Sequence, residues 1–211
     1  MNKRVVIFDL DGVLVDSPAH VLRFFLDTYP TLTKGQMDEM LTGNFPQAMD
    51  EFKSTHTPIV ETEEQNKKRH KEYTDKKAEL PLYEGIQELL HSLHDKGYVL
   101  VVNTSALEKN CLPILEHAGI SKLFDFVATK ELATTKVEKF RTIGDKYKML
   151  PSDMIFVTDT LGDVREADEA NVPTIAVTYG AHDRTFFERE PHDNLVKVVD
   201  SVQDLREYLL S

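Results

Sequence analysis

The sequence predicts an α/β fold, and three observations support this prediction. Short apolar segments such as Val5–Phe8 have the length and the β-branched content of strands buried on both faces. They alternate with amphipathic helical segments, which is the order found in a parallel sheet with right-handed crossovers. Between residues 31 and 81 the strand signals stop and only helical patterns remain. We therefore expect a Rossmann-like parallel sheet with helices on both faces and a small helical cap inserted after the first strand.

The elements follow in order along the chain. After the strand at 5–8, Ser17 and Pro18 form a good helix entry, and apolar residues then recur at helical spacing as far as residue 29. Further strands are expected at 98–102, 123–128, 154–157 and 174–177, with a weaker one at 196–199. Helices are expected at 85–96, 107–117, 136–149, 163–170 and 201–210. The predicted α/β core is therefore formed by residues 1–16 and 82–211, and the predicted cap by residues 17–81.

Composition narrows the classes of function. The 211 residues include 25 basic and 36 acidic side chains, and the net charge of −11 disfavours binding to nucleic acid or to an anionic membrane. The apolar run near the N-terminus is too short for a signal peptide, and no run approaches the ~20 residues of a spanning helix. A cytoplasmic location is the expectation. The single cysteine, Cys111, falls in a helical pattern and is expected to be a packed residue.

Charged and histidine-rich segments do not by themselves indicate a binding site. Basic residues between Lys67 and Lys77 are interleaved with acidic ones, which favours a solvated helix with i,i+4 pairs over an anion-binding patch. His91 and His94 share a helix face but have no cysteine or acidic ligands beside them, so surface positions are expected rather than a zinc site.

The strongest chemical signal follows the first strand, where Asp9 and Asp11 precede Gly12. Two carboxylates this close repel each other unless a cation lies beside them or one keeps a proton. One could attack phosphorus while the other protonates the leaving group. An isolated Asp-x-Asp sequence is more often a turn or a helix cap, so the rest of the chain has to decide between these interpretations.

Other polar residues favour the chemical interpretation. Thr104 follows the second predicted strand, Asp159 and Asp163 follow the fourth, and Lys136 begins the helix after the third. Because the carboxyl ends of parallel strands meet at one edge of a sheet, these side chains are expected to converge on a single pocket with Asp9 and Asp11.

The chain resembles the haloacid dehalogenase-like superfamily of aspartate-nucleophile phosphohydrolases, in the branch of phosphoglycolate phosphatases and β-phosphoglucomutases that have a helical cap. DLDGVLVDS at 9–17 resembles the first motif of that family, and VTDTLGDVREADEANVPTIAV at 157–177 resembles the fourth. VVNTSA and Lys136 match the second and third motifs, which are less specific.

The resemblance implies a role for each matching residue. Asp9 would be the nucleophile and Asp11 the general acid and then the base. Thr104 and Lys136 would bind the substrate phosphoryl group. Mg²⁺ would be bound by Asp9, the carbonyl of Asp11 and Asp159, with Asp163 as a further ligand or a supporting residue; oxygen ligands suit this ion.

Some positions depart from the family pattern. Thr158 stands where the fourth motif usually has glycine, and Val137 follows Lys136 where proline is usual. Lys139 is a poorer candidate than Lys136 for the third motif. At the second motif, Asn103, Thr104 and Ser105 all fit within one residue of register.

Three functions remain open from the sequence. The first is a Mg²⁺-dependent phosphatase acting on a small phosphorylated metabolite, and the second is a phosphosugar mutase of the same family. The third is a non-enzymatic phosphate- or partner-binding module, which the matching acidic residues disfavour. The substrate and the oligomeric state are not predicted.

Overall fold

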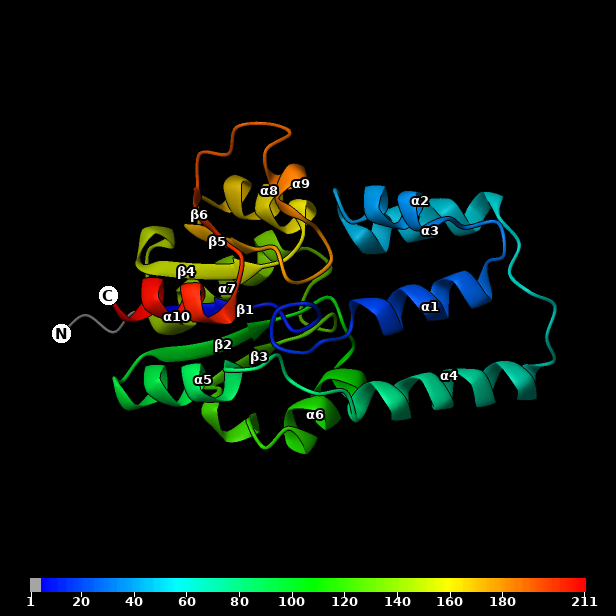
Figure 1. Ribbon diagram of the computed structural model, residues 1–211, viewed down its shortest axis with the longest axis horizontal. Coiled ribbons are helices and arrows are strands. Elements are labelled where there is room, and N and C mark those ends of the chain that lie inside the picture. The colour runs from blue at the N-terminus through cyan, green and yellow to red at the C-terminus, as the bar shows by residue number, and fades with distance from the viewer. Residues whose placement is uncertain (1–4) are drawn as a thin grey trace.

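The computed structural model describes residues 5–211 and contains one six-stranded sheet (Figure 1). The strand order is β3-β2-β1-β4-β5-β6, and every neighbouring pair is parallel. The strands are β1 (Val5–Phe8), β2 (Val99–Asn103), β3 (Phe126–Ala128), β4 (Met154–Thr158), β5 (Thr174–Val177) and β6 (Leu195–Val199). The predicted parallel α/β fold is confirmed, with the fully buried β1 near the middle of the sheet.

Helices cover both faces of the sheet because side chains alternate along each strand. Val6 and Phe8 of β1 pack with α5 (Ile86–Asp95), α6 (Glu108–His117) and α10 (Val202–Leu210). Val5 and Ile7 point to the opposite face, toward α7 (Lys136–Tyr147) and α8 (Leu161–Ala170). This two-sided core fixes the edge at which the loops after β1, β2 and β4 meet.

The structure differs from the predicted elements in a few places. The third strand begins only at Phe126 because residues 121–123 form the 3₁₀ turn η1 (Ser121–Leu123). Helix α8 begins at Leu161 rather than at residue 163, because the Thr160 hydroxyl accepts a hydrogen bond from the Asp163 N–H and caps the helix. A short helix, α9 (Arg184–Phe187), and a second 3₁₀ turn, η2 (Pro151–Asp153), were not predicted.

Residues 17–81, the helical insertion, contain α1 (Pro18–Thr28), α2 (Lys34–Met40), α3 (Phe45–Thr55) and α4 (Glu63–Ala78). Its own small core includes Tyr29, Met37 and Phe52. Helix α4 joins this unit through aromatic packing: the Tyr73 ring stacks on His20 with centroids 4.9 Å apart. Figure 1 shows the insertion beyond one end of the sheet, with α4 running back toward α6.

The insertion is in contact with the core around the loop that follows α2. The Gly162 N–H donates to the Leu41 carbonyl at 3.0 Å, and Arg165 Nη1 donates to the Thr42 carbonyl at 2.5 Å. A Cβ atom on Gly162 would lie 2.1 Å from the Gly43 carbonyl oxygen, so only glycine allows this close approach. The start of α8 is therefore in direct contact with the insertion.

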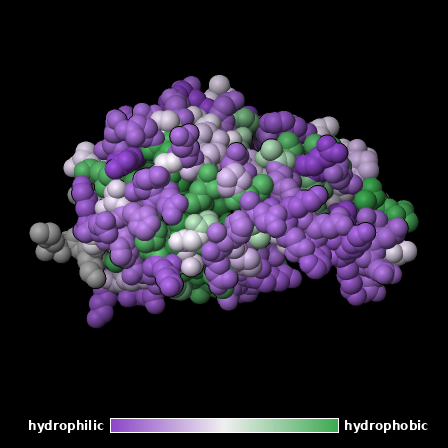
Figure 2. Space-filling view, turned by 60° about the horizontal axis from the view of Figure 1, so that its bottom comes forward, coloured by the Kyte–Doolittle hydropathy of each residue, from purple (hydrophilic) through white to green (hydrophobic). Residues whose placement is uncertain are grey.

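Cys111 is buried in α6, as expected, and His91 and His94 are exposed. Figure 2 shows one face of the molecule, on which hydrophilic residues cover most of the part that carries the helical insertion. In residues 5–211, none of the helices combines the length and the apolar character needed to cross a membrane.

Candidate active site

The Asp9 loop begins where β1 ends beside β4. The Asp9 N–H donates to the Val157 carbonyl at 2.9 Å, and the Leu10 N–H donates to Asp9 Oδ1 at 2.8 Å. Gly12 has a φ of 73°, and a Cβ atom there would lie 1.8 Å from Asp159 Oδ2. Glycine is therefore required both by the turn and by its close approach to Asp159.

Asp9, Lys136 and Asp163 form one buried ion cluster. Lys136 Nζ lies 3.1 Å from Asp9 Oδ2 and 2.7 Å from Asp163 Oδ2, and the Lys136 side chain is 2 % exposed. The Thr158 hydroxyl also donates to Asp163 Oδ2, at 2.7 Å. The structure thus brings together three of the predicted site residues, and Thr158, the departure from the family pattern, holds one of them in place.

The charges in this cluster shift the pKa values of Asp9 and Lys136. Burial raises the pKa of Asp9 to about 7; Lys136 opposes this rise, whereas Asp163 and Asp11 add to it. Burial lowers the pKa of Lys136, but attraction to Asp163 and Asp9 outweighs it, so the net pKa lies above the usual value. Lys136 therefore remains charged while Asp9 titrates near neutral pH.

Asp159 directly follows β4 and lies beside Gly12 of the Asp9 loop. Its Oδ2 accepts a hydrogen bond from the Ala181 N–H at 2.8 Å, whereas its buried Oδ1 has no partner among the described residues. Burial and repulsion from Asp9 raise the pKa of Asp159. An unpartnered buried carboxylate oxygen beside another carboxylate fits the oxygen ligands of a hard cation such as Mg²⁺.

The side chains alone do not form a cation site. In residues 5–211, no group of three His, Cys, Asp or Glu side chains is placed to hold a metal ion. Asp163 Oδ2 is already bonded to Lys136 and Thr158. A cation at Asp9 and Asp159 would therefore need backbone or water oxygens as well.

Asp11 lies in a separate environment from Asp9. Its Oδ1 accepts a hydrogen bond from the Ser17 hydroxyl at 2.6 Å, and Lys77 Nζ lies 2.7 Å from Oδ1 and 2.8 Å from Oδ2. Burial raises the pKa of Asp11, but the charge of Lys77 and the hydrogen bonds from Lys77 and Ser17 bring it below the usual value. This arrangement holds Asp11 as a carboxylate when no substrate is bound.

Thr104 lies in the turn after β2. Its hydroxyl accepts a hydrogen bond from the Ala106 N–H at 3.0 Å, and its carbonyl accepts one from Lys139 Nζ at 2.6 Å. The preceding carbonyl, of Asn103, accepts a hydrogen bond from Lys136 Nζ at 3.0 Å. The turn is thus attached to α7 through two consecutive carbonyls, and one of them shares its lysine with Asp9.

Comparison with known families identifies the chain. The model of the haloacid dehalogenase-like hydrolases matches residues 6–177, a span that includes Asp9, Lys136 and Asp159. The chain belongs to this family. It is therefore an enzyme, a haloacid dehalogenase-like hydrolase, as the resemblance of its motifs implied.

Curated relatives and solved structures agree with this assignment over nearly the whole chain. The pyrophosphatase PpaX of Halalkalibacterium halodurans is 25% identical and covers 97% of each chain. The phosphoglycolate phosphatase of Agrobacterium fabrum is 28% identical over 89% of this chain and 85% of its own. A predicted phosphatase from Clostridium acetobutylicum, with a solved structure, is 26% identical with a TM-score of 0.75 and covers 99% of this chain and 98% of its own.

Two buried lysines of this hydrolase were not found by sequence reasoning. Lys77 was expected on a solvated helix, but it is 6 % exposed and paired with Asp11. His70, Tyr73 and Lys77 share one face of α4 at i, i+3 and i+7, and His70 and Tyr73 both pack on Phe24 of α1. That spacing is the feature of the sequence that indicates a buried face of α4. Lys139 ranks below Lys136 for the third motif, and the structure places Lys136 beside Asp9, but the full burial of Lys139 against the Thr104 carbonyl is not predicted by the sequence.

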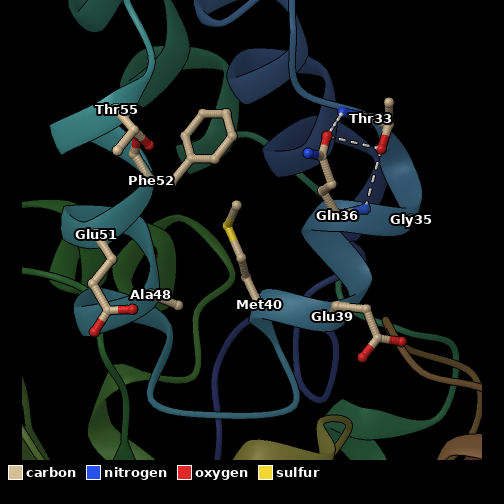
Figure 3. Close-up of a pocket in the computed structure, with 9 residues that line it drawn as sticks. All are labelled: Thr33, Gly35, Gln36, Glu39, Met40, Ala48, Glu51, Phe52 and Thr55. Atoms are coloured by element: carbon tan, nitrogen blue, oxygen red, sulfur yellow. Dashed lines mark hydrogen bonds between the residues drawn. The ribbon is translucent and has the colours of Figure 1, made fainter.

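An open groove on the hydrolase lies between α2 and α3, and its lining includes none of the candidate site residues. Figure 3 shows Met40 and Phe52 facing each other across it, with Glu39 and Glu51 at its edges. Gln36 lines the groove, and its side-chain oxygen accepts a hydrogen bond from the Thr33 N–H as part of the capping box of α2. The residues that line this groove include no lysine, arginine or histidine, and none of them belongs to the Asp9 loop.

Proposed function

We propose that this hydrolase is a phosphatase that removes the phosphoryl group from a small phosphorylated metabolite, with Mg²⁺ and through an aspartyl-phosphate on Asp9. The observation that carries the proposal is the position of Asp9. Its carboxylate lies 3.1 Å from the Lys136 ammonium and on the same loop as Gly12, which packs against Asp159. A carboxylate can approach an anionic phosphoryl group only where positive charge offsets their repulsion.

In the first step, an Asp9 carboxylate oxygen attacks phosphorus and the bond from phosphorus to the leaving oxygen breaks. Asp11 is a carboxylate before substrate binds, and it takes up a proton when the anionic substrate lies beside it and raises its pKa. It then gives this proton to the leaving oxygen, so the leaving group departs protonated. In the second step, Asp11 takes a proton from water while the water oxygen attacks phosphorus. Inorganic phosphate leaves, and the Asp9 carboxylate and the Asp11 acid are restored.

The surrounding residues favour this sequence of steps. Lys136 offsets the negative charge where the phosphoryl oxygens meet Asp9, and the Thr104 hydroxyl can still donate its hydrogen to one of those oxygens. Lys77 and Ser17 fix the orientation of the Asp11 carboxylate. Residues 17–81 act as the cap: their contacts at Gly162 and Arg165 lie at the start of α8, and closure there keeps bulk water out during the first step.

Mg²⁺ would be held by Asp9, Asp159 and the Asp11 carbonyl, with Asp163 supporting them through Lys136. When bound, the ion supplies positive charge beside the phosphoryl oxygens. The unpartnered Oδ1 of Asp159 and the two buried carboxyl groups support this assignment.

The relatives suggest which substrates to examine first. Since they include a pyrophosphatase and phosphoglycolate phosphatases, inorganic pyrophosphate and 2-phosphoglycolate belong in a screen together with sugar phosphates. Pyrophosphate and phosphoglycolate are small and carry a second anionic group.

The experiment is a phosphate-release screen with MgCl₂ and with EDTA, using wild type and Asp9→Asn. We expect release from at least one substrate that depends on Mg²⁺ and falls about 10⁴-fold or more in Asp9→Asn, since that variant lacks the nucleophile. Asp145→Asn, on the exposed part of α7, is the matched control and should retain full activity. Release that persists in Asp9→Asn would show that the assigned nucleophile is wrong, and an isomerised sugar phosphate without free phosphate would indicate a mutase.

A further inference from the structure

Lys139 is a buried charge whose function is not explained by the proposed mechanism. Its side chain is fully buried, although lysine is almost never buried without a partner. Within the described residues it makes no ion pair, and its ammonium donates to the Thr104 carbonyl at 2.6 Å. The contrast with Lys136, one helical turn away, is clear: that ammonium is neutralised by both Asp9 and Asp163.

The position of Lys139 connects it to the turn expected to receive the phosphoryl group. Lys136 and Lys139 donate to the consecutive carbonyls of Asn103 and Thr104, so α7 is hydrogen-bonded to both carbonyls of the turn. The Thr104 N–H donates to the Ala128 carbonyl at 3.0 Å, and the Ala106 N–H to the Thr104 hydroxyl. The turn is therefore fixed on several sides, which leaves the hydroxyl hydrogen of Thr104 available to an incoming anion.

We propose that Lys139 is a positioning residue for the phosphoryl group: its ammonium fixes the Thr104 turn and adds a positive charge that no ion pair within residues 5–211 cancels. This inference rests on the proposed function and deepens it. With Asp9 and Asp163 neutralising Lys136, Lys139 supplies the positive charge that a doubly charged phosphoryl group needs on this side of the site. Phosphate binding should accordingly depend on the charge of Lys139.

The environment of Lys139 determines the pH range over which its ammonium loses its charge. Burial and the charge of Lys136 lower the pKa of Lys139 to about 8, while the carboxylates of Asp9, Asp163 and Glu166 oppose this shift. These groups belong to the loop after β1, to α7 and to α8, the elements packed around the ammonium. Because Lys136 itself keeps a raised pKa, it stays charged over the range in which Lys139 loses its proton.

The test is calorimetric titration of inorganic phosphate into the protein in MgCl₂, from about pH 7.5 to about pH 9. Phosphate is already mostly a dianion over this range. We expect the dissociation constant of wild type to rise about fivefold or more as Lys139 loses its proton. Lys139→Arg, which stays charged, should show less than about a twofold change.

Lys139→Met supplies the complementary measurement. It should bind phosphate about tenfold or more weakly at about pH 7.5, with little further weakening at higher pH, because the charged hydrogen bond is absent throughout. A purely structural role would lower the thermal stability of Lys139→Met but leave the pH dependence of binding as in wild type, and that result would overturn the inference. If either variant fails to fold, a flat pH dependence in wild type alone overturns it.

The outcomes separate this inference from the proposed function. A wild type that releases phosphate from a substrate and needs Asp9, but shows no change in phosphate binding across this pH range, removes the role of Lys139 and leaves the phosphatase intact. Asp9→Asn that still releases phosphate removes the proposed nucleophile. In that case the pH dependence of phosphate binding still decides whether the charge of Lys139 supports the binding of an anion at the Thr104 turn.

Discussion

Asp9 and Asp11 are two residues apart in one loop, yet their carboxyl groups lie in different electrostatic environments. Asp9 shares a single ammonium, that of Lys136, with Asp163, and burial raises its pKa to about 7. Asp11 has the Lys77 ammonium to itself together with the Ser17 hydroxyl, and its pKa falls below the usual value despite burial. Burial raises both pKa values, so the direction of each net shift depends on the positive charge available to the carboxylate: Asp9 shares one ammonium with Asp163, whereas Asp11 has Lys77 and the Ser17 hydroxyl.

The difference suits the proposed division of work between the two groups. A nucleophile that shares its cation is only partly neutralised, so it gains from any further positive charge, such as that of a metal ion. A proton-transfer group gains instead from a fixed orientation, which Lys77 and Ser17 provide. The four predictions below test this comparison in order of expected effect.

The largest effect is expected from Lys136→Met. It leaves Asp9 and Asp163 buried without their cation, which should destabilise the protein by about 3–5 kcal/mol at neutral pH and lower kcat by about 10²–10³-fold. Urea unfolding and phosphate release measure the two effects. The double variant Lys136→Met/Asp163→Asn removes one of the two carboxylates and should recover part of the stability but not the activity. Wild-type stability in Lys136→Met would contradict the shared-cation description.

The second prediction concerns stability against pH. Because the folded pKa of Asp9 lies above the value of about 3.9 expected in the unfolded chain, the folded state binds the extra proton, and stability from this group falls as pH rises from about 4 to about 7. In EDTA at about pH 8, the free energy of unfolding of Asp9→Asn should therefore exceed that of wild type by about 3 kcal/mol. This difference should become smaller toward about pH 5.

Asp11 provides the contrast to this second prediction. Its folded pKa is lowered, so its contribution to stability is present above its unfolded pKa and is lost as pH falls through the folded value. Asp11→Asn should then be less stable than wild type at both pH values. Added MgCl₂ should stabilise wild type at about pH 8 and have less effect on Asp159→Asn. Equal pH profiles for the two aspartate variants would remove the distinction between their sites.

The third prediction is for Lys77→Met, which leaves Asp11 with Ser17 alone. We expect kcat to fall about 10–100-fold, with a smaller change in KM, because the orientation of the proton-transfer group changes rather than the binding of phosphate. Lys77→Arg should recover much of the rate. Lys67→Met, on the same helix but with a side chain 74% exposed, is the matched control and should behave as wild type. If kcat/KM of Lys77→Met falls only because KM rises, Lys77 acts in substrate binding instead.

The sequence predicted the Asp9 side of this comparison better than the Asp11 side. Asp9, Asp163 and Lys136 follow strands or begin a helix at one edge of a parallel sheet, and parallel topology alone brings such positions together. The alternation of strands and helices predicted that topology. The small adjustments, such as α8 beginning at Leu161, did not move any of these residues to another edge.

Lys77 and Lys139 could not be placed in the same way. Their burial depends on how helices α4 and α7 are rotated against distant segments, which a charged pattern does not define. In α4 the many polar residues conceal the face that packs on α1, and in α7 both Lys136 and Lys139 point inward. The energetic penalty of burying an ammonium makes a solvated lysine the correct default. That default fails at sites where a carboxylate or a carbonyl receives the charge.

The smallest effect is expected from Ser17→Ala, which tests whether Lys77 alone is sufficient to hold Asp11. The buried Ser17 hydroxyl donates to Asp11 Oδ1 at 2.6 Å, and removing it should destabilise the protein by about 1 kcal/mol and lower kcat only a few-fold. Ser17 and Lys77 contact the same carboxylate, so the double variant Ser17→Ala/Lys77→Met should depart from additivity by about 0.5–3 kcal/mol in unfolding free energy. Strict additivity would show that the two groups act on Asp11 independently, and the fixed orientation inferred for that carboxylate would then have to come from the loop backbone.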